Sequence, residues 1–187
     1  MRLFLAFELS ERVKEGLQVA QRRLAEFDRC VRWLRPEQMH LTVKFLGEVP
    51  DSEVEAVCAA AGEVAAGSAP FTMETAGFGC FPPRGRVRIV HAPVVGETRR
   101  LERSRDLCEE VLAGLGFARE ERAFSPHLTV GRVKEDRTNG RLRQAVETIR
   151  PQRVSQDVGE LFVVQSVLSR GGAEYANIAR HKLCGTA

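Results

Sequence analysis

The chain lacks a long hydrophobic run. The apolar stretch at its N-terminus, within MRLFLAFELSERVKE, is too short for a signal peptide or a membrane-spanning helix. A short apolar and aromatic run of this kind is typical of a buried strand. We therefore expect a cytoplasmic protein with no membrane attachment.

The chain also lacks the cysteine spacing of a stapled or zinc-binding domain. Its cysteines are odd in number and widely spread, and none forms a C-x-x-C pair; they are Cys30, Cys58, Cys80, Cys108 and Cys184. Neither a disulfide framework nor a zinc knuckle follows from this pattern, and a reducing compartment is the simplest setting.

Several catalytic motifs are missing as well. We find no G-x-S-x-G nucleophile elbow, no Walker loop and no dinucleotide fingerprint. The segment GFGCFPPRG is rich in glycine, but its spacing fits none of the phosphate-binding templates. We expect it to be a loop between strands.

What the chain does have is an ordinary globular composition. It is 187 residues long, 43% hydrophobic and 28% charged, which suits one domain or two small lobes with a buried core. The net charge of +3 is slight, but most of the 28 basic residues are arginine. Arginine suits bidentate contact with phosphate, so the composition favours an anionic partner, although a solvated surface can look the same.

Strand and helix patterns alternate along the chain without a low-complexity linker. Alternation and turn residues predict strands over 2–8, 31–34, 39–46, 71–78, 87–91, 124–133, 160–169 and 175–183, the last two joined by a turn at Gly171-Gly172. Helical spacing predicts helices that begin near 10, 50, 97 and 138. The polar and apolar alternation favours antiparallel sheets with one covered face. We predict an α+β fold over residues 1–187, a single two-lobed domain with an internal duplication.

The tetrapeptide His-Leu-Thr-Val occurs twice, beginning at His40 and at His127. Alternate side chains of a strand share a face, so His40 and Thr42 point one way, and the leucine, the valine and Phe45 point the other. His127 and Thr129 share a face in the same manner. If the two strands lie side by side at the centre, two imidazoles and two hydroxyls converge on one site.

The chemistry of these residue types suits phosphoryl transfer. An imidazole titrates near pH 6.5, so one histidine can act as a base and another as an acid, and a threonine hydroxyl can bind a phosphoryl oxygen. The alternatives are a structural histidine on each strand, or a metal site. Zinc normally needs a third protein ligand, and no acidic residue stands at a metal spacing near either histidine; His91 and His181 lack the threonine partner.

The chain resembles the two-histidine phosphoesterase superfamily, and within it the RNA 2′,3′-cyclic phosphodiesterases, also called 2′-5′ RNA ligases. The matching segments are RLFLAFEL, VRWLRPEQMHLTVKFLGEV, FPPRGRVRIV, FSPHLTVGRV and LFVVQSVLSRGGAEYANIA, nearly end to end. One departure is visible near Val90, where members often have a tryptophan and this chain reads RIVHA. The resemblance implies a bilobal fold with a pseudo-twofold, antiparallel sheets and flanking helices around a central cleft.

The resemblance also implies an activity. It is the metal-free and cofactor-free hydrolysis of a 2′,3′-cyclic phosphate at an RNA end to a 2′-phosphate, with reversible ATP-independent 2′-5′ ligation as a side reaction. His127 would be the proton acceptor and His40 the proton donor, while Thr42 and Thr129 would bind the phosphate oxygens. The partner would be RNA with a cyclic phosphate end, and a monomer is the default expectation.

Four side chains and two functions stay open. The resemblance suggests that Arg132 binds phosphate, but strand parity places it off the histidine face unless a bulge intervenes. Tyr175 either lines the rim of the cleft or packs in a hairpin, and we favour packing. Phe78 and Phe81 either stack on a base or pack in the core. The alternative functions are an RNA-end binding module without turnover, and a phosphodiesterase for a small cyclic nucleotide or a 2′-5′ oligoadenylate.

Overall fold

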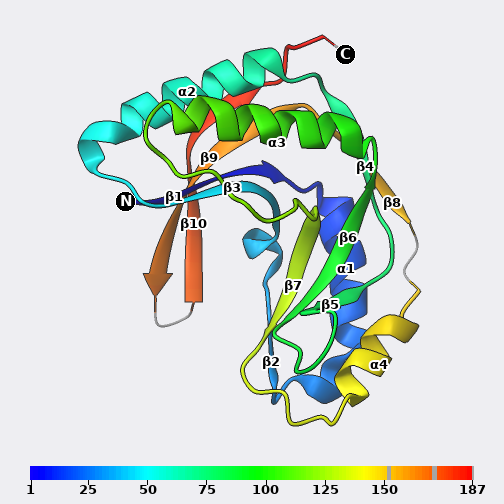
Figure 1. Ribbon diagram of the computed structural model, residues 1–187. Coiled ribbons are helices and arrows are strands. Elements are labelled where there is room, and N and C mark those ends of the chain that lie inside the picture. Colours follow the sequence, from blue (N-terminus) through cyan, green and yellow to red (C-terminus); the bar gives the residue numbers. More distant parts are fainter. Residues whose placement is uncertain (151–152, 170–171, 187) are drawn as a thin grey trace.

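Two antiparallel sheets, each covered by a pair of helices, make up the chain in a computed structural model that describes residues 1–150, 153–169 and 172–186 (Figure 1). The strands are β1 (Arg2–Glu8), β2 (Val31–Trp33), β3 (His40–Glu48), β4 (Phe71–Thr75), β5 (Gly79–Phe81), β6 (Ile89–Gly96), β7 (His127–Val133), β8 (Val154–Val158), β9 (Glu160–Ser169) and β10 (Gly172–Lys182). The helices are α1 (Glu11–Arg23), α2 (Val54–Gly67), α3 (Thr98–Ala113) and α4 (Arg141–Thr148).

In both sheets the strand that carries the histidine pairs with the strand that precedes a long helix, β3 with β1 and β7 with β6. The four-stranded sheet runs β3-β1-β9-β10, and the six-stranded sheet runs β7-β6-β4-β8, with β2 added outside β7 and β5 paired with β6. Every described strand pair is antiparallel. The predicted α+β class with antiparallel sheets is therefore confirmed, and β3 with β1 corresponds to β7 with β6.

The helices are exchanged between the sheets. Helix α1 follows β1 of the four-stranded sheet but packs on the six-stranded one, where Gln21 Nε2 donates to the carbonyl oxygens of Leu34 at 2.8 Å and Val130 at 2.9 Å. Helix α3 follows β6 of the six-stranded sheet but packs on α2 and β3. Figure 1 shows α2 and α3 together over the four-stranded sheet, and α1 and α4 beside the other.

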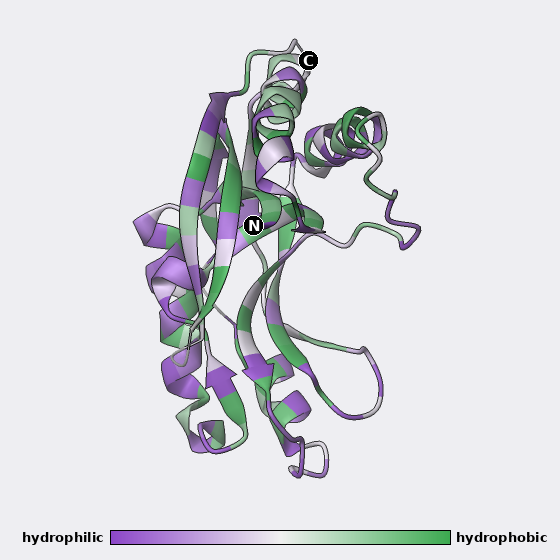
Figure 2. Cartoon of the chain, turned by 90° about the vertical axis from the view of Figure 1, so that its left-hand side faces the viewer, coloured by the Kyte–Doolittle hydropathy of each residue, from purple (hydrophilic) through white to green (hydrophobic). Residues whose placement is uncertain are grey.

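Local sequence explains where the elements begin and what they bury. The Ser10 hydroxyl caps α1 by accepting from the amide of Val13 at 3.3 Å, as predicted for a helix that starts there. The inward residues of the two sheets join one buried cluster, so the core is continuous beneath both. In Figure 2 hydrophilic and hydrophobic residues alternate along the strands, as expected when each sheet has one covered face.

Some element predictions are wrong. The glycine-rich segment is not only a loop, because it contains the short strand β5, and β8 was not predicted at all. Neither segment has a strong apolar alternation of its own; each is a strand because it pairs with a neighbour, β5 with β6 and β8 with β4. The turn predicted at Gly171-Gly172 lies partly outside the described residues.

Two further observations concern the chain as a whole. In the part of the chain that the structure describes, no helix is both long and apolar enough to cross a membrane. All five cysteines are free thiols.

Candidate active site

The two HLTV repeats form the starts of corresponding strands. His40 is the first residue of β3, and His127 is the first residue of β7. In both strands the histidine and the threonine are half-buried, while the leucine and valine are buried in the core, as the alternation predicts. Strands β3 and β7 contact one another, so the two half-sites are neighbours although their sheets differ.

A β-bulge interrupts both strands at the valine of the repeat. Opposite β1 the register passes from Thr42 to Lys44, and opposite β6 it passes from Thr129 to Gly131, so one valine in each strand has no partner. The extra residue reverses the parity, and the side chain five positions after each histidine returns to the histidine face. Arg132 is brought to this face in the second repeat by such a bulge.

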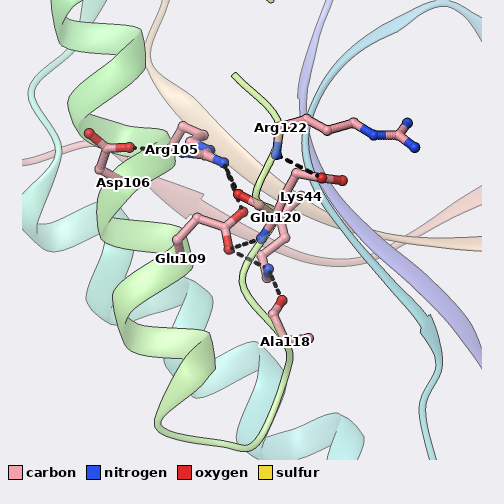
Figure 3. Close-up of polar contacts among 7 residues, drawn as sticks. All are labelled: Lys44, Arg105, Asp106, Glu109, Ala118, Glu120 and Arg122. Carbon is pink, nitrogen blue, oxygen red and sulfur yellow. Dashed lines mark hydrogen bonds and ion pairs between the residues drawn. The ribbon is translucent and has the colours of Figure 1, made fainter. Parts of the chain in front are cut away.

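In the first repeat the same bulge places Phe45 on the histidine face. The prediction that Phe45 lies on the covered face is wrong, because its side chain is 67% exposed. Lys44 takes the inward place at 5% exposed, with Nζ 2.6 Å from Glu109 Oε2 of α3 and 2.8 Å from the carbonyl oxygen of Ala118 (Figure 3). Glu109 also accepts from the amide of Glu120 at 3.1 Å. This network ties β3 to the segment that leads into β7.

A pocket of about 450 Å³ lies between the two sheets beside these residues. Its walls include three arginines and three aromatic side chains, Arg2, Phe4, Arg32, Phe45, Arg132 and Tyr175. The positions five residues after His40 and after His127 therefore line the same space.

The His40 imidazole packs against two residues that line this pocket, and it itself lines a smaller neighbouring one. Its ring centroid lies 4.6 Å from that of Phe4 and 5.0 Å from that of Tyr175. Burial and the nearby Arg132 charge lower the pKa of His40 to about 4, against a hydrogen bond with the Gln38 backbone that raises it. Tyr175 also packs edge-on against Phe4, so it lines the pocket as well as packing against β1.

The His127 imidazole is fixed by its own backbone. Nδ1 lies 2.7 Å from the carbonyl oxygen of Ser125, two residues earlier, so a neutral ring donates from Nδ1 and leaves Nε2 as an acceptor. The position two residues before His40 is Gln38, whose backbone plays the corresponding part. The two half-sites thus correspond beyond the tetrapeptide.

Comparisons with known proteins agree with this arrangement. A family model described as LigT like Phosphoesterase matches residues 7–91. The RNA 2′,3′-cyclic phosphodiesterase of Methanothermobacter thermautotrophicus is 30% identical over 184 residues, which cover 98% of this chain and 99% of that protein. The chain belongs to the LigT-like phosphoesterase family. The resemblance seen in the sequence is confirmed.

Solved structures of this phosphoesterase family have the same fold. A Thermus thermophilus protein matches with a TM-score of 0.79 and 30% identity, covering 100% of both chains. The Escherichia coli LigT crystallised with 3′-AMP matches with a TM-score of 0.79 and 25% identity, covering 97% of each chain. The chain is thus an enzyme of the phosphoesterase class in its fold and its family.

His91 also lies beside this phosphoesterase site, although its sequence context, which lacks a threonine partner, did not mark it as a site residue. His91 of β6 lies opposite Thr129, stacks on Phe81 with ring centroids 4.0 Å apart and an 11° angle, and meets the His127 ring edge-on at 5.4 Å. It is 7% exposed, and none of the described residues makes a hydrogen bond with its Nδ1. Burial, and secondarily His127, lower the pKa of His91 to about 4. Strand register, rather than any motif, puts His91 there.

The donors present do not form a recognisable metal site. Among the described residues no three His, Cys, Asp or Glu side chains are grouped so that they can hold an ion.

Phe81, whose role the sequence left open, packs against His91 and meets the His127 ring edge-on at 4.9 Å. What the two half-sites offer is two imidazoles and two hydroxyls on neighbouring strands, with the Arg132 guanidinium lining the pocket beside them.

Proposed function

We propose that the chain hydrolyses 2′,3′-cyclic phosphate ends of RNA to 2′-phosphate ends by two-histidine acid–base catalysis without a metal. The observation that carries the proposal is that the half-site occurs twice. Each of two corresponding strands presents on one face a histidine, a threonine and the residue five positions after the histidine. The relatives named RNA 2′,3′-cyclic phosphodiesterase and the LigT structure with 3′-AMP support the same substrate class.

In this proposal His127 is the proton acceptor. Its Nδ1 proton is held by the Ser125 carbonyl, so Nε2 carries the lone pair that removes a proton from the attacking water. The 3′ oxygen departs on the opposite side of phosphorus, and it takes a proton from His40. An in-line displacement needs a proton acceptor and a proton donor on opposite sides of phosphorus. Each of them contributes about 10²–10⁴-fold to the rate.

His40 can donate a proton only when its imidazole is protonated. Binding of the anionic substrate promotes this protonation. Without an anion, burial and Arg132 keep the pKa of His40 at about 4, so the imidazole is neutral at pH 7. An anionic cyclic phosphate beside the ring favours the imidazolium and offsets the Arg132 charge, because an opposite charge nearby raises the pKa of a histidine. Arg132 then binds phosphate, and the Thr42 and Thr129 hydroxyls donate to its non-bridging oxygens.

The rest of the proposal follows from the same site. If a 5′-hydroxyl replaces water as the nucleophile, the product is a 2′-5′ linkage, and the reversal of this step needs no ATP. We further propose that the chain acts as a monomeric, single two-lobed domain in the cytoplasm, without a cofactor.

The test is turnover of a cyclic-phosphate-ended RNA in the presence of EDTA. Hydrolysis should be lost in His40→Ala and in His127→Ala, and kept in the control His181→Gln, since His181 lies beside Gly62 of α2 on the covered side of its sheet. If the wild type bound the RNA without hydrolysing it, the protein would instead be an RNA-end binding module. Activity that vanishes with the chelator would refute the metal-free mechanism.

A further inference from the structure

The histidine of each half-site is in contact with two further rings. His40 packs against two aromatic side chains, one from β1 and one from β10. The His127 ring lies nearly at right angles to the rings of Phe81 and His91, at interplanar angles of 81° and 73° and centroid distances of 4.9 Å and 5.4 Å. The proposed reaction gives neither Phe81 nor His91 a part.

Phe81 and His91 form a stacked pair, with ring centroids 4.0 Å apart and planes tilted by 11°. Stacked and edge-to-face contacts between rings are both favourable, so the pair and the His127 ring stabilise one another. Phe81 ends β5, and Gly79 at the start of that strand lies opposite His91. A Cβ on Gly79 would come within 3.1 Å of His91 Nε2, so the glycine leaves room for the imidazole.

The His91 side chain is held by its ring and not by a hydrogen bond at Nδ1. It is buried, and none of the described residues pairs with that nitrogen. Burial keeps the pKa of His91 at about 4, so the ring beside His127 is uncharged at neutral pH. It therefore does not repel the positive charge that forms when His127 accepts a proton. What His91 offers to His127 is an uncharged ring in a fixed place.

The two half-sites reach this arrangement with different residues. Ala6 of β1 lies opposite Thr42, which is the place that His91 of β6 takes opposite Thr129. Alanine has no ring, and in that half-site Tyr175 of β10 supplies the second contact. Each histidine thus has two ring neighbours although different strands provide them. This is expected if the contacts serve the histidines.

We infer that Phe81 and His91 are positioning residues for the proton acceptor, and that the stacked pair stops the His127 ring from turning about its Cβ–Cγ bond. The inference rests on the proposed function, because it concerns the base of that reaction. The hydrogen bond between Nδ1 and the Ser125 carbonyl oxygen fixes one point of the ring, and the two perpendicular contacts fix its plane. Nε2 then stays directed at the attacking water. Misplacing a catalytic group by about 1 Å can cost roughly 100-fold in rate.

The first test compares three substitutions of His91 on an RNA that ends in a cyclic phosphate. His91→Ala and His91→Gln remove the ring and should lower kcat about tenfold or more, with KM changed by less than about threefold. His91→Phe keeps a ring and should retain kcat within about threefold. The control His181→Ala removes an imidazole whose Nε2 also lacks a partner among the described residues, and it should change neither constant. Wild-type kcat in His91→Ala, or a His91→Phe variant as slow as His91→Ala, would overturn the inference.

Phe81→Leu removes the other ring of the stacked pair, and it keeps the test open if His91→Ala does not fold. It should lower kcat by a similar factor. Combined with His91→Gln it should lower kcat little further, because both side chains act through the one His127 ring. Losses that multiply in the double variant would mean two separate roles and would contradict the inference.

A measurement without substrate separates this inference from the proposed function. In ¹⁵N NMR spectra the neutral His127 ring of the wild type and of His91→Phe should carry its proton on Nδ1, whereas His91→Ala should show a mixture of both tautomers. If the wild type has no turnover but the tautomers differ in this way, the proposed function fails and the positioning of His127 stands. The same tautomer in all three proteins would refute the positioning.

Discussion

Replacing His91 with phenylalanine should make the protein less sensitive to acid. In the folded chain burial and His127 lower the pKa of His91 from 6.5 to about 4. Between these pH values the unfolded chain carries a proton on this imidazole and the folded chain does not. The unfolded state therefore binds more protons, and the free energy of unfolding falls as the pH falls through this window.

The size of the effect follows from the two pKa values. One pKa unit corresponds to about 1.4 kcal/mol, so lowering the pH from 7.5 to 4.5 should cost the wild type about 2.5 kcal/mol of stability through His91 alone. A phenylalanine retains the stacking on Phe81 but cannot titrate. The variant should lose about 2.5 kcal/mol less than the wild type over the same interval.

The assay is urea unfolding of both proteins at pH 7.5 and 4.5, with His91→Gln as a second non-titrating variant. Subtracting the variant from the wild type removes the contribution of every other group, His40 included. The glutamine and phenylalanine variants should show the same pH dependence even if their stabilities at pH 7.5 differ. Equal losses in the wild type and both variants would refute a buried neutral imidazole at this position.

Three more predictions follow from the site and its support. Lys44→Met should cost about 3 kcal/mol of unfolding free energy in urea, because it leaves Glu109 buried without its lysine, whereas Lys44→Met with Glu109→Leu should cost less. Arg132→Gln should raise the pKa of His40, measured by NMR titration, by up to about one pH unit, since burial is the larger cause of its low value. Gly131→Ala should cost about 1–3 kcal/mol in the same unfolding assay, because the new Cβ would lie 2.7 Å from the ring of the neighbouring tryptophan.

Each of these has a result that contradicts it. A double variant less stable than the lysine variant would mean that the ion pair is a net stabiliser. An unchanged or lower pKa for His40 would place the Arg132 charge outside its reach, and an alanine at 131 without cost would mean that the tryptophan ring moves freely aside.

The alternation of the HLTV strands was readable from the sequence because it needs only a strand and a covered face. The sequence patterns also predicted α1 correctly, since its cap at Ser10 and its apolar spacing are local signals. The resemblance to a known family named the same four residues, His40, Thr42, His127 and Thr129, on its own grounds. These predictions share one property, which is that no distant part of the chain has to be known.

The predictions that were wrong or left open depend on pairing between distant segments. Phe45 was assigned to the wrong face because the bulge exists only relative to β1. Arg132 stayed open because its bulge exists only relative to β6, and His91 was set aside because it becomes a neighbour of Thr129 only when those strands pair. Register is a property of two strands, so parity counted along one strand cannot supply it.

The exchange of helices between the sheets has a consequence for how the protein holds its shape. The chain leaves the four-stranded sheet after β1 and the six-stranded sheet after β6, packs on the opposite sheet as α1 or α3, and later returns as the strand that carries a histidine, so each helix joins the two halves. Separating the two halves would require α1 or α3 to detach from the sheet on which it packs. The separation of β3 and β7, and with it that of His40 and His127, is therefore set by the packing of α1 and α3 as well as by the sheets.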